Sequence, residues 1–241
     1  MKKIFALLLS AALLVTLLAA CGGGNTTDTD TDTQEPAADA STTQVEEQEP
    51  DTGDASKDDP LNQDEIGEKE LLVVSFGTSY NDSRRETIGA IEKAMQTAFP
   101  DYSVRRAFTS QIIIDHVKDR DGVTIDNVEQ ALERAVNNGV KTLVVQPTHL
   151  MNGLEYEELT DELAKYSDSF EKIAIGDPLL TSDADFEAVM TAITDATKDA
   201  ADGKTAICFM GHGTTADSNS VYSKMQTLLT DKGFNDYYVG T

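Results

Sequence analysis

The chain contains three histidines, and one of them lies in a stretch well suited to acid–base or metal chemistry. His212 lies between Gly211 and Gly213, directly after an apolar run, so no bulky neighbour in the sequence shields its imidazole. A neutral imidazole binds borderline divalent metal ions, and its pKa of about 6.5 lets it accept a proton near neutral pH. His212 is therefore the first candidate for a metal ligand or proton acceptor. The alternative is a histidine in an ordinary turn.

A second histidine, His149, also follows a β-rich run. Glu155 comes shortly afterwards, in the first turn of an expected helix, so we expect both side chains to face one cleft. The third histidine, His116, lies within another expected helix and is predicted to be a surface residue. A structural zinc site needs four ligands, which two histidines and the available cysteines do not supply. An open site that holds a metal ion transiently fits these residues better.

Polar residues also follow the first expected strand, in the stretch Ser75-Phe76-Gly77-Thr78-Ser79. Gly77 permits a tight turn. The stretch is neither a Walker loop nor a Gly-x-Gly-x-x-Gly dinucleotide loop, because neither pattern continues downstream. Its side chains either cap the following helix or form a polar lip on a ligand cleft, with Ser75 and Thr78 as the candidate cleft residues.

The elements around these candidates predict an α/β fold. Short apolar runs alternate with amphipathic stretches, which is typical of buried parallel strands joined by right-handed helical crossovers. Ligand sites in such sheets form in the loops at the carboxyl ends of the strands. The expected strands are 71–76, 103–108, 142–146, 172–175, 205–210 and 237–239. The expected helices are 83–98, 111–119, 125–138, 153–167, 183–199 and 218–231.

Residues 1–21 have the pattern of a secretory signal peptide. Lys2 and Lys3 precede an apolar run that ends in Leu18-Ala19-Ala20-Cys21, which resembles the bacterial lipobox. In that pattern the cysteine receives a diacylglycerol before cleavage. Cys21 would then anchor the chain to a membrane outside the cytoplasm, at the cell surface or in the periplasm. The alternative is an uncleaved anchor that ends in an unrelated cysteine.

Residues 22–68 are predicted to be a disordered acidic tether. Asp, Glu, Thr, Ser and Gln are abundant there, and Lys57 is the single basic residue. Such a stretch buries too little apolar surface to offset chain entropy, and like charges extend it. A cation-binding acidic segment is the alternative. The globular part is expected from residue 69, with a first lobe at 69–200 and the start of a second at 201–241.

The composition excludes several classes of protein. The whole chain has 43 acidic and 19 basic side chains and a formal net charge of −24. A protein that binds nucleic acid by neutralising phosphates needs the opposite balance, so no nucleic-acid partner is expected. Two cysteines exclude a disulfide-rich scaffold and a four-cysteine zinc site. The oligomeric state, including a homo-oligomer, is left open.

Several segments follow one another from residue 69 onward: LLVVSFGTSYNDSRRETI, RAFTSQIII, DGVTIDNVEQAL, HLMNGLEYE, GDPLL and CFMGHGT. In this order they resemble the anaerobic sirohydrochlorin cobalt chelatases of the CbiK type, which are class II chelatases like ferrochelatase. The resemblance implies two α/β lobes with parallel sheets flanked by helices, and a tetrapyrrole cleft between them. It also implies a lyase of tetrapyrrole and cobalamin biosynthesis, which inserts a divalent metal into sirohydrochlorin and releases two pyrrole protons.

The resemblance also assigns roles to residues. His212 matches the histidine of the family's Met-Gly-His-Gly motif, a metal ligand and proton acceptor, and His149 and Glu155 match a second histidine and an acid that line the cleft. Co²⁺ enters as a substrate, with Fe²⁺ or Ni²⁺ as alternatives, because the same ligands suit all three ions. No permanently bound cofactor is implied. The carboxylates of the substrate require positive charge in the cleft, and four arginines are candidates to supply it. The alternative is that these arginines are ordinary surface residues. These arginines are Arg84, Arg85, Arg105 and Arg106.

The family's other metal ligands are a glutamate in a V-E-x-Y-P stretch and a histidine in a G-D-H stretch. Both lie downstream of the segment that matches Val239-Gly240-Thr241. We therefore expect the second lobe to be incomplete and this chain to be a largely inactive fragment of a longer gene product, or else a degenerate form. A chelatase anchored outside the cytoplasmic membrane is the leading hypothesis. The alternative is a non-catalytic lipoprotein that binds a metal or a tetrapyrrole for an uptake system.

Overall fold

The structure is a computed structural model that describes residues 51–241. The chain divides into two units, Met1–Gln48 and Glu49–Thr241, and all described residues belong to the second. Cys21 and the predicted signal peptide lie outside the described residues. No helix within residues 51–241 is long and apolar enough to cross a membrane.

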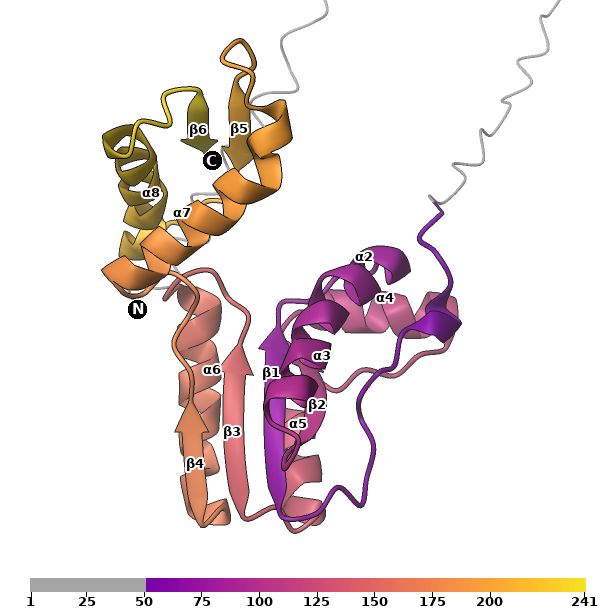
Figure 1. The fold of residues 1–241 in the computed structure, drawn as a ribbon. Coiled ribbons are helices and arrows are strands. Elements are labelled where there is room, and N and C mark those ends of the chain that lie inside the picture. The colour runs from indigo at the N-terminus through magenta and orange to yellow at the C-terminus, as the bar shows by residue number, and fades with distance from the viewer. Residues whose placement is uncertain (1–50) are drawn as a thin grey trace, which may run out of the picture. The chain divides into compact units, whose positions relative to one another are not determined.

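The predicted strands and helices are confirmed to within a few residues (Figure 1). The strands are β1 (Lys69–Ser75), β2 (Ser103–Phe108), β3 (Thr142–Pro147), β4 (Lys172–Ile175), β5 (Ile207–Met210) and β6 (Tyr237–Gly240). The helices are α2 (Asn81–Glu86), α3 (Ile88–Ala98), α4 (Gln111–Asp121), α5 (Val128–Asn137), α6 (Leu154–Lys165), α7 (Asp183–Thr197) and α8 (Ser220–Asp231). Short 3₁₀ turns are η1 (Ala55–Lys57), η2 (Ser167–Ser169), η3 (Lys198–Ala200) and η4 (Asp217–Asn219).

One predicted helix is divided in two. The expected helix at 83–98 is interrupted at Thr87, which separates α2 from α3. The Thr87 hydroxyl donates a hydrogen bond to the Ser83 carbonyl oxygen at 2.6 Å. Such back-bonding of a threonine to the preceding turn competes with the helical ladder and often bends a helix.

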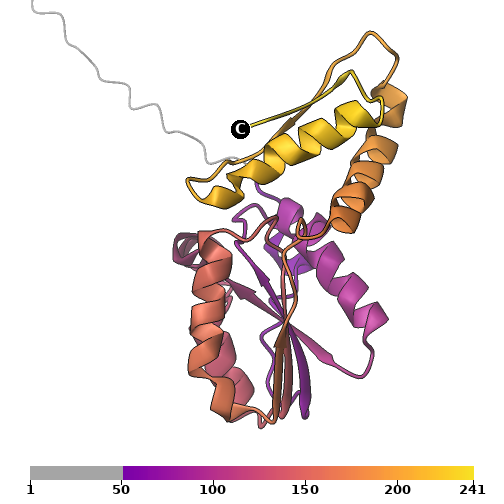
Figure 2. The same cartoon turned by 90° about the vertical axis from the view of Figure 1, so that its left-hand side faces the viewer.

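The first lobe is built on a four-stranded parallel sheet in the order β2-β1-β3-β4. Leu72 and Val74 of β1 face a core formed with α5 and α6. Leu71 and Val73, which alternate with them, pack on the opposite face with Met95 of α3. Helices therefore lie on both faces of the sheet, as Figures 1 and 2 show. Burial of both faces explains why β1 reads as a continuous apolar run.

The second lobe contains the parallel pair β5–β6 and the helices α7 and α8. Phe186 and Met190 of α7 share its core with Ile207 of β5 and Leu229 of α8. The lobe therefore begins at α7, earlier than the expected boundary at residue 201. The sequence pattern identifies α7 as a helix but does not say which sheet covers its apolar face.

The other face of the β5–β6 pair is open. Met210 is 87% exposed and Tyr238 is 50% exposed, and Cys208 is also exposed. These three side chains lie on the face of the pair that points away from α7 and α8.

Residues 51–68 differ from the composition-based prediction of a disordered tether. Asp58 and Leu61 are buried against the first lobe, and the backbone N–H of Arg106 in β2 donates to the Leu61 carbonyl oxygen at 3.1 Å. Composition misses this packing because it depends on one carboxylate and one leucine, not on a run of apolar residues.

Candidate functional site

A pocket of about 910 Å³ collects side chains from both lobes. Its lining comes from loops at the carboxyl ends of β1, β3, β5 and β6, from the first turn of α6 and from α8. The lining residues are Phe76, Thr148, His149, Leu150, Met151, Gly153, Leu154, Glu155, His212, Gly213, Thr214, Thr215, Asn219, Tyr222 and Thr241. Apolar walls with a few polar groups are typical of a site for a small organic ligand.

The structure brings His149, His212 and Glu155 to this one pocket. The two histidines reach it because each follows the carboxyl end of a parallel strand, β3 for His149 and β5 for His212. The His149 loop is held to the segment between the lobes. There the N–H groups of Leu179 and Leu180 donate to the carbonyl oxygens of His149 and Leu150 at 3.0 and 2.9 Å.

The imidazole of His149 is shielded from solvent but has no bonding partner within residues 51–241. Neither ring nitrogen accepts or donates a hydrogen bond there. Burial lowers the pKa of His149, and the nearby carboxylate of Glu155 opposes this shift only in part. The ring is therefore neutral at pH 7, and a neutral imidazole carries the lone pair that a metal ion or a proton requires. A buried polar group without a partner calls for an explanation, and a bound ligand is a physical one.

His212 is exposed, as its position between glycines predicts. The glycines, however, serve the protein's own packing. A Cβ on Gly211 would lie 2.2 Å from the Tyr222 ring, so the space beside Gly211 is filled by that ring and is not free for a flat ligand. Gly213 has φ +77°, a left-handed conformation that glycine adopts without strain, and its N–H donates to the Tyr222 hydroxyl at 3.3 Å.

Ser75 and Thr78 are not in the lining of the pocket. Ser75 is buried, and its hydroxyl accepts a hydrogen bond at 2.8 Å from Thr148, which does line the pocket. The Thr78 hydroxyl accepts from the Tyr80 N–H at 3.3 Å. Both residues thus support loops near the site, whereas Phe76 between them contributes its ring to the wall.

Sequence reasoning missed several lining residues. Phe76 and Met151 lie in the loops that follow β1 and β3, but only polar residues of these loops were predicted to face the cleft. Tyr222 lies on α8, and no local pattern marks it. The one sequence feature that relates to Tyr222 is Gly211, because a glycine there leaves room for the Tyr222 ring.

The four arginines expected to neutralise substrate carboxylates are not in the lining of this pocket either. Arg84, Arg105 and Arg106 are almost fully buried and pair with carboxylates of the protein itself. Their partners include Asp58, Glu70, Glu92 and Asp126. Arg85 is partly exposed and pairs with Asp82 at 3.0 Å. The prediction is wrong for Arg105 and Arg106 because both faces of β2 are covered, which the sequence of this strand does not show.

The described part of the chain contains no ready-made metal cage. Within residues 51–241, no group of three or more His, Cys, Asp or Glu side chains is close enough to hold a metal ion. Two imidazoles in an open pocket can hold a metal weakly and release it, in contrast to a closed structural site. The remaining exposed histidine, His116 on α4, is on the surface as predicted.

Comparison with known proteins agrees with this architecture. The family model described as cobalt chelatase (CbiK) matches residues 69–241. The sirohydrochlorin cobaltochelatase of Salmonella typhimurium is 35% identical over 166 residues, which are 69% of this chain and 62% of that protein. The sirohydrochlorin cobaltochelatase CbiKC of Nitratidesulfovibrio vulgaris is 29% identical over 163 residues, 67% of this chain and 57% of that protein. The chain thus spans less than two thirds of the length of these relatives. Because the family match covers most of the sequence, this chain belongs to the cobalt chelatase (CbiK) family.

Proposed function

We propose that the pocket binds sirohydrochlorin or a related carboxylated tetrapyrrole and that the protein inserts Co²⁺ into it. The observation that carries the proposal is the neutral, unpartnered imidazole of His149 in a pocket that His212 also lines. The names of the two relatives support cobalt and sirohydrochlorin as the substrates. The pocket volume of about 910 Å³ lies at the upper end of the roughly 300–1,000 Å³ that is usual for ligand sites, as a macrocycle requires.

The walls suit a flat macrocycle with charged edges. Phe76, Leu154 and Tyr222 offer apolar or aromatic surface to a ring face. The lining includes no Arg or Lys, and Glu155 adds a negative charge. We therefore place the peripheral carboxylates of the substrate toward solvent, where water can stabilise them, and the ring in the pocket.

Metal insertion requires that the ion lose water, approach one face of the ring and replace two N–H protons. In our proposal His149 and His212 take the place of water on Co²⁺, which then passes to the pyrrole nitrogens. Each pyrrole N–H bond that breaks leaves its electron pair on nitrogen for the metal and gives its proton to a base. The exposed His212 ring, once it has released the metal, accepts the first proton, passes it to solvent and then accepts the second, so that both protons leave through this ring.

The insertion assay tests this function directly. Protein purified from its full gene is mixed with sirohydrochlorin and Co²⁺, and the absorption bands of the macrocycle are followed. We expect repeated insertion, and a loss of about 10²–10⁴-fold in rate for His212→Ala, the range for removal of one general base. His116→Ala is the matched control, because that histidine is exposed and outside the pocket lining.

The outcomes separate the alternatives. A spectral change that stops at one equivalent, without turnover, identifies a binding protein of an uptake system and contradicts the proposed insertion. A wild-type rate from His212→Ala refutes the proton transfer. Assays with Fe²⁺ and Ni²⁺ at equal concentration establish whether Co²⁺ is preferred, since the ligand types alone suit all three ions.

We also propose that the protein is a lipoprotein anchored outside the cytoplasm through Cys21. The lipobox-like stretch before Cys21 supports this. Replacement of Cys21 by Ser should release the protein from the membrane fraction, whereas Cys208→Ser should leave it there. If the Cys21→Ser protein still fractionates with membranes after a carbonate wash, the anchor is not a lipid on this residue.

A further inference from the structure

Residues 51–68, here called the strap, precede the segment that matches the family yet form part of the folded domain. The strap leads into β1 and contains the short turn η1, which Asp54 caps by accepting the Ser56 N–H. Leu61 is buried in one hydrophobic cluster with Leu71 and Val73 of β1. The strap therefore contributes to the core and does not merely lead up to it.

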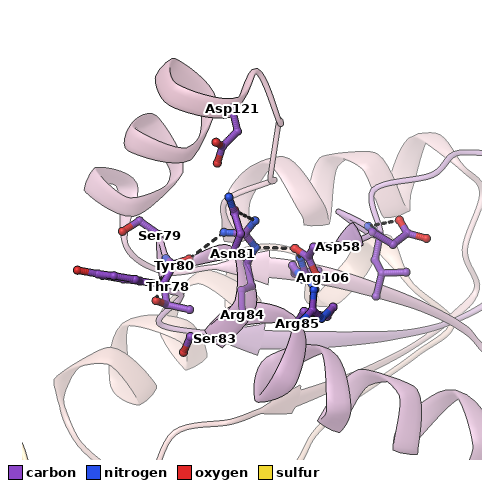
Figure 3. A network of polar contacts seen from close by, with 12 residues as sticks. Asp58, Thr78, Ser79, Tyr80, Asn81, Ser83, Arg84, Arg85, Arg106 and Asp121 are labelled. Atoms are coloured by element: carbon purple, nitrogen blue, oxygen red, sulfur yellow. Dashed lines mark hydrogen bonds and ion pairs between the residues drawn. The ribbon is translucent and has the colours of Figure 1, made fainter. Parts of the chain in front are cut away.

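The anchor of the strap is the carboxylate of Asp58 (Figure 3). Its Oδ2 accepts from Arg84 Nε at 2.5 Å and from Arg106 Nη1 at 2.7 Å, and its Oδ1 accepts from Arg106 Nη2 at 3.0 Å. Burial would raise the pKa of Asp58, but the two guanidinium groups outweigh it and hold that pKa below its ordinary value. Asp58 therefore stays charged at neutral pH inside the domain.

Both arginines need this carboxylate because they are buried. Arg84 is 0% exposed and Arg106 is 1% exposed. Arg106 has a second carboxylate partner in Glu92, at 2.7 Å. The other acceptors to which Arg84 donates are neutral: Asn81 Oδ1 at 2.6 Å and the Thr78 carbonyl oxygen at 3.1 Å. Removal of one partner from a buried ion pair is strongly destabilising, since it leaves an uncompensated charge.

The strap also covers an open edge of the sheet. β2 is the outermost strand on its side, and an exposed edge strand offers unpaired backbone groups to other chains. Arg106 N–H donates to the Leu61 carbonyl oxygen at 3.1 Å, and the Gln63 side chain donates to the Val104 carbonyl oxygen at 3.3 Å. The Ser103 hydroxyl donates to the Ile66 carbonyl oxygen at 2.6 Å.

The same strap holds the loop that borders the pocket. Arg84, fixed by Asp58, donates to the Thr78 carbonyl oxygen within the loop between β1 and α2. The Asp82 N–H donates to the Thr52 carbonyl oxygen at 2.9 Å, and the Asn81 side chain donates to the Gly53 carbonyl oxygen at 3.1 Å. Phe76, which contributes its ring to the pocket, lies in this loop. A chain of direct contacts thus joins Asp58 to the loop that carries a wall of the site.

We propose that residues 51–68 are a clamp supplied in cis, and that docking of Asp58 between Arg84 and Arg106 keeps the Phe76–Tyr80 loop in the shape that closes one wall of the pocket. The proposal is independent of what the pocket binds. It assigns to part of the acidic N-terminal segment a role in the site, in addition to any role as a tether.

Hydrogen exchange followed by mass spectrometry on the full chain tests this clamp. Asp58→Asn removes the charge but keeps the shape of the side chain. We expect exchange at residues 76–84 to accelerate about tenfold or more, the factor for loss of one charge-assisted hydrogen bond, with little change in β3 and β4. Asp59→Asn is the matched control. It removes the same charge from the neighbouring exposed residue, and its amide oxygen can still accept from the Leu61 N–H.

Two results would overturn the proposal: unchanged exchange at 76–84 in Asp58→Asn, or an equal acceleration throughout both lobes. If Asp58→Asn does not fold, the wild-type chain still gives an answer. Its exchange in low concentrations of guanidinium should show the Asp82 amide, bonded to Thr52, and the Arg106 amide, bonded to Leu61, opening in one step. Opening of the Asp82 amide by a separate, easier step contradicts the clamp.

Discussion

At the scale of single residues, the site depends on one neutral imidazole held away from water. His149 lines the pocket, both of its ring nitrogens are buried without a partner in the described chain, and burial lowers the pKa of the ring. Burial of this imidazole also lowers the stability of the protein without a ligand, because a shielded polar group without a hydrogen bond loses its interactions with water. A protein gains from such a group only when a ligand binds to it.

This cost predicts a pH dependence of stability. The folded-state pKa of His149 is below its ordinary value, so the unfolded chain takes up a proton at a higher pH than the folded chain. As the pH falls through about 6.5, the contribution of His149 to the free energy of unfolding should therefore decrease, until the folded form also becomes protonated. Glu70 contributes with the opposite sign in this window, because burial raises its pKa to about 7. Urea titrations between pH 7.5 and 5.5 measure this slope.

The control for that slope is a comparison of variants. His149→Ala should remove the His149 contribution, so that the free energy of unfolding falls less, or rises more, towards pH 5.5 than in the wild type. His116→Ala should keep the wild-type slope because His116 is exposed. An unchanged slope in His149→Ala would mean that the imidazole is not desolvated as the structure has it.

At the scale of elements, the period of the apolar residues predicted most of the fold. β1 and β3 contain apolar runs, whereas β2 has two adjacent buried arginines at its centre, and all three positions agree closely with the expected strands. Two features lay beyond such patterns. The division at Thr87 falls within a stretch whose residues suit one continuous helix, and the assignment of α7 to the second lobe depends on contacts between distant segments.

The site shows the same limit. The strand-end rule predicted that His149 and His212 would face one cleft, and both line one pocket, because the carboxyl ends of parallel strands lie at one edge of a sheet. Tyr222 and the burial of the arginines could not be predicted, since each depends on which element covers a given face. The docking of residues 51–68 could not be predicted from their acidic composition, because nothing in it distinguishes Asp58 from the other acidic residues.

The start of α7 gives an element-scale prediction. Ser182 and Asp185 form a capping box: the Ser182 hydroxyl accepts the Asp185 N–H at 3.3 Å, and the Asp185 carboxylate accepts the Ser182 N–H at 2.7 Å. Ser182→Ala should lower the free energy of unfolding by about 1 kcal/mol, the usual effect of losing an N-cap. Thermal unfolding followed by circular dichroism measures the change.

Ser223→Ala, on the exposed face of α8, is the control for that cap. It removes a hydroxyl inside a helix, where alanine is the better helix former, so little or no loss is expected. Equal destabilisation by the two variants would show that the cap does not define the start of α7.

At the scale of the whole molecule, the charge distribution separates the site from the bulk of the chain. The net charge is −24, yet the pocket lining carries Glu155 as its one carboxylate and no Arg or Lys. The acidic surface should attract divalent cations. In our proposal the imidazoles of the pocket then select them, and its apolar side chains surround the organic ligand. Both lobes contribute to the lining, so the site requires that they fold as parts of one protein.

The most direct test of the central claim is an NMR titration of the three histidine rings with Zn²⁺, a diamagnetic stand-in for Co²⁺. Ring nitrogens report ligation individually, and the chain has only three histidines to assign. We predict that the signals of His149 and His212 shift together along one binding curve and reach a plateau in excess metal, while the signals of His116 stay in place. A shift at His116 with none at His149 and His212 would contradict the assignment of this pocket as the metal-handling site.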